Sequence, residues 1–149
     1  MEIERKFLVH NIPFPLAGYT AVRIEQGYLC TEPVVRIRKQ DEQYILTYKS
    51  KGFLSREEYN LPLGADGYAH LRTKVDGHLI SKTRYIIPLE EELCVELDVF
   101  DGPHQGLILA EVEFTSEAQA KAFTPLPWFA EDVTYETQYQ NSTLSRTAG

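Results

Sequence analysis

Charged residues of the same sign recur two positions apart along this 149-residue chain. VVRIRK carries Arg36 and Arg38, and CVELDVF carries Glu96 and Asp98. On a β-strand this spacing places both charges on one face, roughly 6.6 Å apart along the strand. Their repulsion is small in water and grows in a confined space of low dielectric constant. A bound ligand of opposite charge would offset it, so the pairs indicate a site for ions.

Arginine, lysine and carboxylate side chains gathered in one site could perform phosphoryl chemistry. Arg and Lys bind phosphoryl oxygens, and clustered carboxylates hold hard divalent cations such as Mg²⁺ or Mn²⁺. Phosphoryl transfer needs both, since the metal neutralises developing charge and can activate the attacking water. Counting one face of each strand-like run, the candidate cations are Lys6, Arg36, Arg38, Lys49, Lys82 and Arg84. The candidate acids are Glu2, Glu4, Glu58, Glu96, Asp98, Glu111 and Glu113.

The opening MEIERKFLV shows how charged and apolar residues alternate between the two faces of a strand. Glu2, Glu4 and Lys6 point to one side of a strand, and Ile3 and Phe7 point to the other. Taken alone, each run also fits an antiparallel sheet with one solvated face, on which charged and apolar residues alternate. Solvated faces usually mix the two signs, whereas these runs mostly pair like with like. We therefore interpret the charged faces as lining a shared interior.

Strand-like runs separated by turn signals position these residues. Short connections make the sheet mainly antiparallel, and its charged faces converge only if it curls into a barrel. The sequence predicts a mainly β (α+β) fold in a single domain, 1–149: a closed eight-stranded antiparallel barrel, or tunnel, with a charged interior and a few flanking helices. Strands are expected at 2–9, 21–30, 33–40, 43–50, 55–62, 79–87, 92–100 and 106–114. Helices are expected at 115–123, where Ser116 and Gln119 form a capping box, and at 66–75, where Asp66 is the cap.

The apolar faces of such a barrel point outward and must be covered. The two short helices and the segment PLPWFAEDV, residues 125–133, are too small to cover all of them. We expect a homodimer to hide the remainder. The segment 125–133 is expected to plug one end of the tunnel, with Trp128 packed against that end.

The composition indicates which kinds of binding partner this protein has. The net charge of −7 argues against a nucleic-acid-binding module, which usually has a basic face. No run of eighteen apolar residues and no secretory signal is present, so no membrane association is expected. Cys30 and Cys94 lie far apart and predict neither a disulfide framework nor a metal site. These features favour a cytoplasmic protein that binds a small molecule.

Glu2-x-Glu4-x-Lys6 resembles the ExExK signature of the CYTH proteins, the triphosphate tunnel metalloenzymes, and the later charge rows follow in that family's order. RIR, LTYKS, LSREEY and ELDVF look most like its bacterial inorganic triphosphatases. The resemblance implies an eight-stranded tunnel that hydrolyses tripolyphosphate with Mg²⁺ or Mn²⁺. It implies phosphate contacts from Lys6, Arg36, Arg38, Lys82 and Arg84. It implies metal contacts from Glu2, Glu4, Glu111 and Glu113, with Glu58, Glu96 and Asp98 as the remaining acidic wall.

Tyr28, in QGYL, and Lys49, in LTYKS, match a pair of residues that the resemblance implies activates water. A lysine surrounded by cations and partly desolvated has a lowered pKa and could act as a general base. Without the resemblance, Tyr28 is more simply an aromatic residue packed in a wall, and Lys49 a surface lysine.

Two departures from the family pattern leave alternatives open. Asn60 stands where relatives commonly have a second glutamate, and Thr137 and Gln138 stand where relatives usually have basic residues. One alternative is an enzyme of the same fold acting on an organic triphosphate: a thiamine triphosphatase, a nucleotide triphosphatase or a class IV adenylate cyclase. The other is a polyphosphate-binding module without turnover.

Overall fold

Nine strands and three short helices form residues 2–146, the part of the chain that the computed structural model describes. The strands are β1 (Glu2–Leu8), β2 (Thr20–Thr31), β3 (Val34–Gln40), β4 (Gln43–Lys49), β5 (Ser55–Arg56), β6 (Glu58–Leu63), β7 (Asp76–Pro88), β8 (Cys94–Asp101) and β9 (Ile108–Glu113). The helices are α1 (Ala65–Arg72), α2 (Glu117–Ala122) and α3 (Asn141–Leu144), with 3₁₀ turns η1 (Gly102–His104) and η2 (Thr137–Tyr139). No helix within 2–146 is long and apolar enough to cross a membrane.

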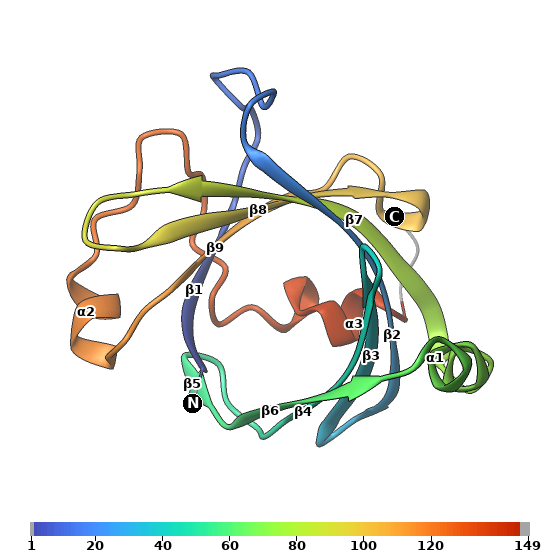
Figure 1. The fold of residues 1–149 in the computed structure, drawn as a ribbon. Coiled ribbons are helices and arrows are strands. Elements are labelled where there is room, and N and C mark those ends of the chain that lie inside the picture. The colour runs from blue at the N-terminus through green and yellow to red at the C-terminus, as the bar shows by residue number, and fades with distance from the viewer. Residues whose placement is uncertain (1, 147–149) are drawn as a thin grey trace.

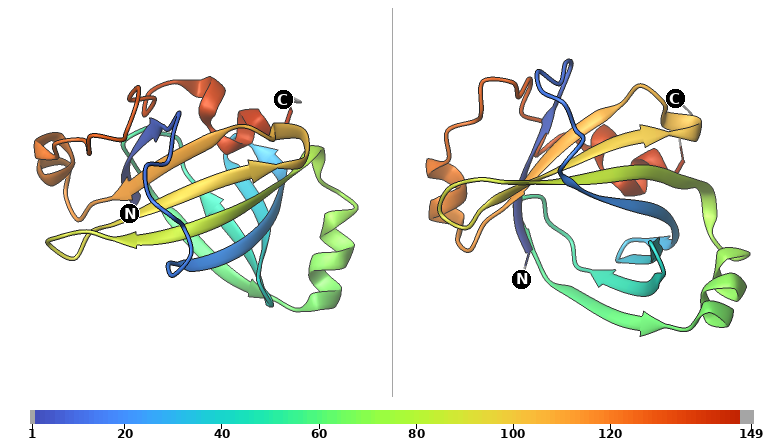
Figure 2. Two further views of the ribbon diagram at one scale, coloured as in Figure 1. Left: turned by 90° about the horizontal axis from the view of Figure 1, so that it is seen from above. Right: turned by 45° about the horizontal axis from the view of Figure 1, so that its top comes forward.

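The strands form one antiparallel sheet that curls into a nearly closed barrel (Figure 1, Figure 2). Their order is β5-β1-β9-β8-β7-β2-β3-β4-β6. The predicted strand 55–62 is divided into two. Its first part, β5, pairs with β1 through Arg56 and Glu2, and its second part, β6, pairs with β4 through Glu58 and Lys49. This one segment therefore bridges both edges of the sheet, which is why nine strands are found where eight were predicted.

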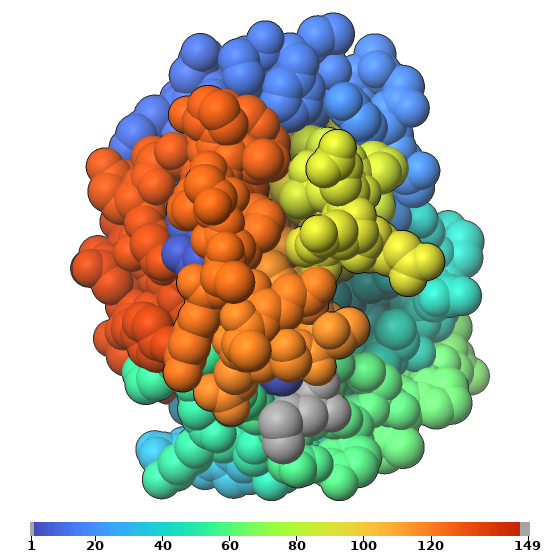
Figure 3. Space-filling model, turned by 90° about the vertical axis from the view of Figure 1, so that its left-hand side faces the viewer, coloured from blue at the N-terminus to red at the C-terminus, as the bar shows by residue number. Residues whose placement is uncertain are grey.

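The predicted alternation of side chains holds along the barrel wall. Ile3, Leu97 and Val112 are buried in an apolar cluster on the outside of the barrel. Residues of the loop between β1 and β2, of α2 and of the segment 125–133 pack in this cluster. Figure 3 shows the segment that contains α2, in orange, spread over this side of the molecule. The apolar core on this side thus lies outside the ring of strands, and the charged faces of the strands line the interior.

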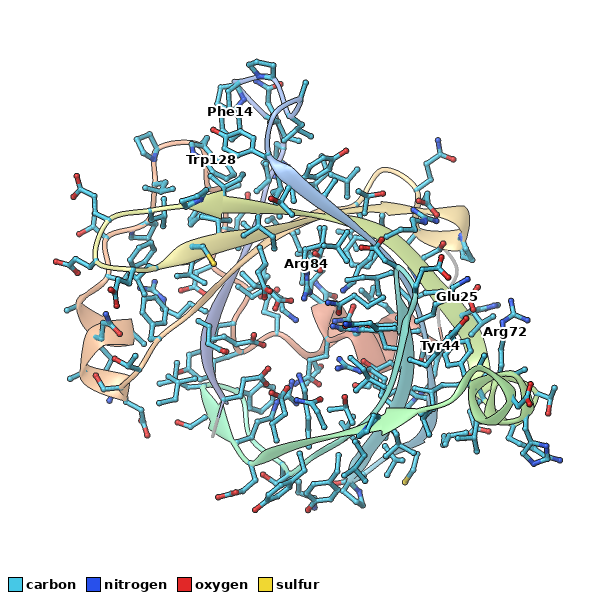
Figure 4. The ribbon with its side chains drawn as sticks, in the orientation of Figure 1. Phe14, Glu25, Tyr44, Arg72, Arg84 and Trp128 are labelled. Atoms are coloured by element: carbon cyan, nitrogen blue, oxygen red, sulfur yellow. The ribbon has the colours of Figure 1, made fainter. Side chains whose placement is uncertain are left out.

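The segment 125–133 covers the outer wall and does not plug the barrel, so that prediction was wrong. Trp128 packs edge-on against Phe14 and Phe129, with ring centroids 5.2 and 4.7 Å apart. Figure 4 places Phe14 and Trp128 outside the ring of strands. The aromatic side chains of this segment pack on the apolar cluster of the outer wall, whereas most side chains that line the interior are charged or polar. Helix α3 and the turn before it lie across one end of the barrel instead (Figure 1).

Both predicted helices are present, with shifted bounds. In α2 the Ser116 hydroxyl accepts from the backbone N–H of Gln119 at 3.1 Å, and the Gln119 side chain accepts from the backbone N–H of Thr115 at 2.9 Å. The predicted capping box is therefore confirmed, with its reciprocal bond one residue earlier. Helix α1 already begins at Ala65, so Asp66 lies in its first turn and the predicted Asp66 cap is wrong.

Arg5 ties the outer face of β1 to the segments that cover it. Its guanidinium donates to the carbonyl oxygens of Ala120 and Phe123 at 3.1 and 2.9 Å and pairs with Asp132 at 2.9 Å. We expect Arg5→Met to lower the free energy of unfolding by about 1–3 kcal/mol, because buried acceptors lose their donor. Chemical denaturation measures this loss. A variant as stable as the wild-type protein would contradict the role.

Candidate functional site

A cavity of about 350 Å³ lies inside the barrel, and every strand contributes at least one side chain to its lining. Polar side-chain ends from opposite walls face one another there, among them Arg84 (Figure 4). The predicted site residues that line it are Glu2, Glu4, Lys6, Tyr28, Arg36, Arg38, Lys49, Glu58, Arg84, Glu96, Glu111 and Glu113. Lys82 and Asp98 are the predicted residues that do not reach it.

Lys82 and Asp98 form a fully buried ion pair beneath the cavity wall. The Lys82 Nζ atom lies 2.7 Å from Asp98 Oδ2, and both side chains have almost no exposed surface. Arg84 contacts the same carboxylate, with Nε 2.7 Å from Oδ1 and Nη2 2.9 Å from Oδ2. Burial raises the pKa of Asp98, but Arg84 and Lys82 together lower it further than burial raises it. The carboxylate is therefore ionised and is already held by two cations.

A second group of ion pairs lies on the opposite wall, around Glu2. The Glu2 carboxylate accepts from Lys49 Nζ at 3.0 and 3.1 Å and from Arg56 Nε at 3.1 Å. Glu58 lies 3.4 Å from the same lysine nitrogen. Burial and then the Arg36 charge lower the pKa of Lys49, against the opposing effect of Glu2. Lys49 is thus a buried amine whose proton is held less firmly than that of an exposed lysine.

Tyr28 and Lys49 both line the cavity, as the resemblance implied. Tyr28 is almost completely buried and lies on β2, opposite Arg36 of β3. Among the residues that the structure describes, no hydrogen bond joins the Tyr28 hydroxyl to Lys49. The two side chains therefore share one chamber without a hydrogen bond between them in the described part of the chain.

Glu4 and Glu111 are neighbouring acids with opposite pKa shifts. Burial raises the pKa of Glu4 well above its ordinary value, and the charges of Glu111 and Glu2 raise it further. Burial also raises the pKa of Glu111, but Lys6, with Nζ 3.7 Å from Glu111 Oε1, and then Arg84 lower it more. Glu4 therefore retains a proton at a pH at which Glu111 is ionised.

The sequence patterns did not identify some of the residues that line the cavity. Arg56 lies two positions before Glu58 and shares its face, so the alternation itself contained that signal. Thr137 and Gln138, where basic residues are absent, lie in η2 outside this cavity. Several neutral lining residues carry no charge pattern that could have revealed them, among them Thr47, Gln140, Asn141 and Ser142.

The carboxylates are suitable ligands for a hard divalent cation, but they do not form a complete coordination shell for one. Within residues 2–146, no three Asp, Glu, His or Cys side chains are close enough together to hold a metal ion by themselves. Glu4, Glu111 and Glu113 nevertheless line one cavity, and burial raises the pKa of Glu4 and of Glu113 because no cation compensates them fully. Mg²⁺ is usually held by one or two carboxylates together with waters and substrate phosphates. The oxygen donors present fit Mg²⁺ or Mn²⁺ bound in that way.

Comparisons with known proteins agree with this geometry. The chain is 44% identical over 147 residues to an inorganic triphosphatase of Nitrosomonas europaea, covering 97% of this chain and 96% of that protein. It is 32% identical over 148 residues to an inorganic triphosphatase of Acetivibrio thermocellus, covering 96% and 92%. The crystal structure of the inorganic triphosphatase NE1496 is 40% identical, covers 97% of this chain and 94% of its own, and gives a TM-score of 0.72.

A family model extends this similarity to almost the whole chain. The model described as the CYTH domain matches residues 1–148. The nearly closed antiparallel barrel and its charged cavity are what the ExExK resemblance implied. The chain therefore belongs to the CYTH domain family.

Proposed function

We propose that this protein is a metal-dependent inorganic triphosphatase that hydrolyses tripolyphosphate to pyrophosphate and orthophosphate. One observation carries the proposal: arginines, lysines and carboxylates from every wall of the barrel line one cavity of about 350 Å³. Such a site can neutralise a polyanion and its metal together. The names of the two curated relatives, both inorganic triphosphatases, support this choice of substrate.

The cations would bind and orient the phosphate chain. Lys6, Arg36 and Arg38 line the cavity and present donors to phosphoryl oxygens. Arg84 is held rigidly by Asp98 and Glu96, so its remaining donors have a fixed direction. The acids proposed to hold Mg²⁺ or Mn²⁺ are Glu2, Glu4, Glu58, Glu96, Glu111 and Glu113. A bound ion would supply neutralisation of phosphate charge and a more acidic water.

Lys49 is proposed as the group that takes the proton of the attacking water. The water oxygen attacks the terminal phosphorus, the bond to the bridging oxygen breaks, and pyrophosphate leaves with that electron pair. The lowered pKa of Lys49 supports this role, because a neutral amine is required to accept the proton. Tyr28 lines the same chamber and would orient the water. Most of the rate should come from positioning and electrostatics.

Phosphate release tests the proposal directly. The protein is incubated with tripolyphosphate, ATP and thiamine triphosphate in parallel, each with Mg²⁺ or Mn²⁺. Release from tripolyphosphate well above the other two is expected. Preference for an organic triphosphate would make the protein a different enzyme of the same fold. Tight binding without release from any of them would make it a polyphosphate-binding module.

Binding of metal and triphosphate together should release protons. The raised pKa of Glu4 extends the pH range over which this group is protonated, and a carboxylate must lose its proton to ligate a metal. Titration calorimetry in two buffers of different ionisation enthalpy should detect release of up to about one proton per site at pH values where Glu4 is still protonated. Apparent metal affinity should rise with pH. Glu4→Gln should abolish most of the release, and an unchanged release in that variant would contradict the assignment.

We also propose a cytoplasmic homodimer. Tyr48, Tyr59 and Leu61 are exposed on the outer faces of β4 and β6 and form an apolar patch, which supports a second copy as its cover. The free cysteines Cys30 and Cys94 support a reducing compartment. Sedimentation at micromolar concentration should give a dimer, and Leu61→Glu should dissociate it. A monodisperse wild-type monomer would contradict the proposal.

A further inference from the structure

The cations around the cavity differ in what holds them. Most contact a carboxylate: Lys6 contacts Glu111, and the ion pairs around Glu2 and Asp98 account for the rest. Arg36 and Arg38, neighbours on β3, are the exceptions among the cavity cations within residues 2–146. Their hydrogen-bonded partners there are neutral side chains. Two buried positive charges therefore have no carboxylate within ion-pair distance in the described part of the chain.

Gln26 holds Arg38. Its Oε1 atom accepts from Arg38 Nε at 2.8 Å, and Gln26 has no exposed surface. The contact uses the Nε donor and leaves the outer guanidinium nitrogens of Arg38 free of protein acceptors in the described chain. Arg38 itself lines the cavity, whereas Gln26 lies behind it. Burial, with the charges of Arg36 and Arg84, lowers the pKa of Arg38 to about 9, as expected for a cation that lacks a counter-ion.

Thr47 holds Arg36 in the same manner. Its Oγ1 atom accepts from Arg36 Nη2 at 3.2 Å and donates to Asn60 Oδ1 at 2.6 Å, so the hydroxyl has one fixed orientation. Thr47 has no exposed surface. Asn60 is the neutral residue at the position where relatives commonly carry a glutamate. The chain from Asn60 through Thr47 to Arg36 thus contains no negative charge.

We propose that Gln26 and Thr47 are positioning residues that orient Arg38 and Arg36 without neutralising them, so that these two arginines make the strongest contacts with the phosphate chain. A carboxylate at either position would orient the arginine equally well. It would also compete with the phosphate for the same charge, because the two anions would share one cation in a poorly solvated space. The inference rests on the proposed function, since it names the part of that site that attracts the anion.

The substitution Gln26→Glu tests whether neutralising the charge of Arg38 weakens phosphate binding while the orientation of Arg38 is kept. The variant keeps the shape and the acceptor of Gln26 and adds the missing counter-ion. The KM for tripolyphosphate should rise roughly tenfold to a hundredfold, the range that one hydrogen bond to a charged group supplies. The kcat should change less. The Tm of the substrate-free variant should equal or exceed that of the wild-type protein, because the buried Arg38 charge gains a partner.

Matched variants distinguish this role from a merely structural one. Gln26→Met keeps the volume and removes the acceptor, so it should lower the Tm and also raise KM. Thr47→Val should raise KM with a small change in Tm. Gln105→Glu adds the same charge in the exposed connection between β8 and β9 and serves as the control, with KM unchanged. The inference is overturned if Gln26→Glu keeps the wild-type KM, or if it is less stable than Gln26→Met.

A binding measurement keeps this inference separate from the proposed function. The increase in Tm on adding tripolyphosphate without metal is recorded for the wild-type protein and for Gln26→Glu. A large shift for the wild type and a small one for the variant support the inference even if neither protein releases phosphate. Equal shifts overturn the inference even if the wild-type protein proves to be a triphosphatase.

Discussion

Replacing Lys49 by methionine is expected to lower kcat for tripolyphosphate by a factor of roughly 10² to 10⁴, the usual contribution of a positioned general base. The side chain is almost completely buried, and burial and the Arg36 charge lower its pKa, so its amine loses a proton more readily than that of an exposed lysine. Methionine keeps the length and loses the nitrogen. Phosphate release under saturating substrate measures the change.

Lys49→Arg is the matched control for this prediction. Arginine keeps the positive charge beside Glu2 and Glu58 and gives up its proton far less readily than lysine. If Lys49 accepts the proton of the attacking water, this variant should be nearly as inactive as Lys49→Met. If it retains most of the activity, Lys49 acts as a point charge and another group is the base. The Tm of both variants shows whether the barrel has survived.

Asp98→Asn is expected to cause the largest loss of stability. The carboxylate compensates Lys82 and Arg84 in a fully buried position, and asparagine leaves both cations without it. Removing one partner from a buried ion pair typically costs about 3–5 kcal/mol. Chemical denaturation at pH 7 should show a loss of this size. Tripolyphosphate should restore part of it, because the bound anion compensates Arg84, which lines the cavity.

The pH dependence of stability provides a second test of Asp98. Its pKa in the folded protein lies below the ordinary value of 3.8. The ionised group therefore stabilises the fold at pH values above 3.8, and this contribution is lost as the pH falls through the lowered folded value. Asp98→Asn should remove that part of the acid-side loss of stability. An unchanged acid profile would show that other carboxylates dominate it.

Period-two alternation was sufficient to predict the barrel and most of its interior. Arg36 and Arg38, like Glu111 and Glu113, share a face because successive side chains of a strand alternate, and no tertiary information is needed to see it. That the faces point inward followed from their signs, since like charges gather only where a ligand or opposite charges compensate them. The outward position of apolar residues such as Leu97 then followed without further assumption.

Other features depend on tertiary contacts that alternation does not record. Residues 55–62 have the pattern of one strand, and only the separate pairing partners on its two sides divide it. Trp128 is apolar enough to plug a tunnel or to cover a wall, and the charged interior decides between these. Gln26 and Thr47 are neutral, so their importance appears only when their contacts with Arg38 and Arg36 are known.

Helix α3 and the turn before it lie across one end of the barrel and narrow the route into the chamber from that side (Figure 1). The entering polyanion and the departing products would then pass mainly through the other end. A chamber narrowed at one end favours short phosphate chains that fit inside it over long polymers threaded from one side to the other.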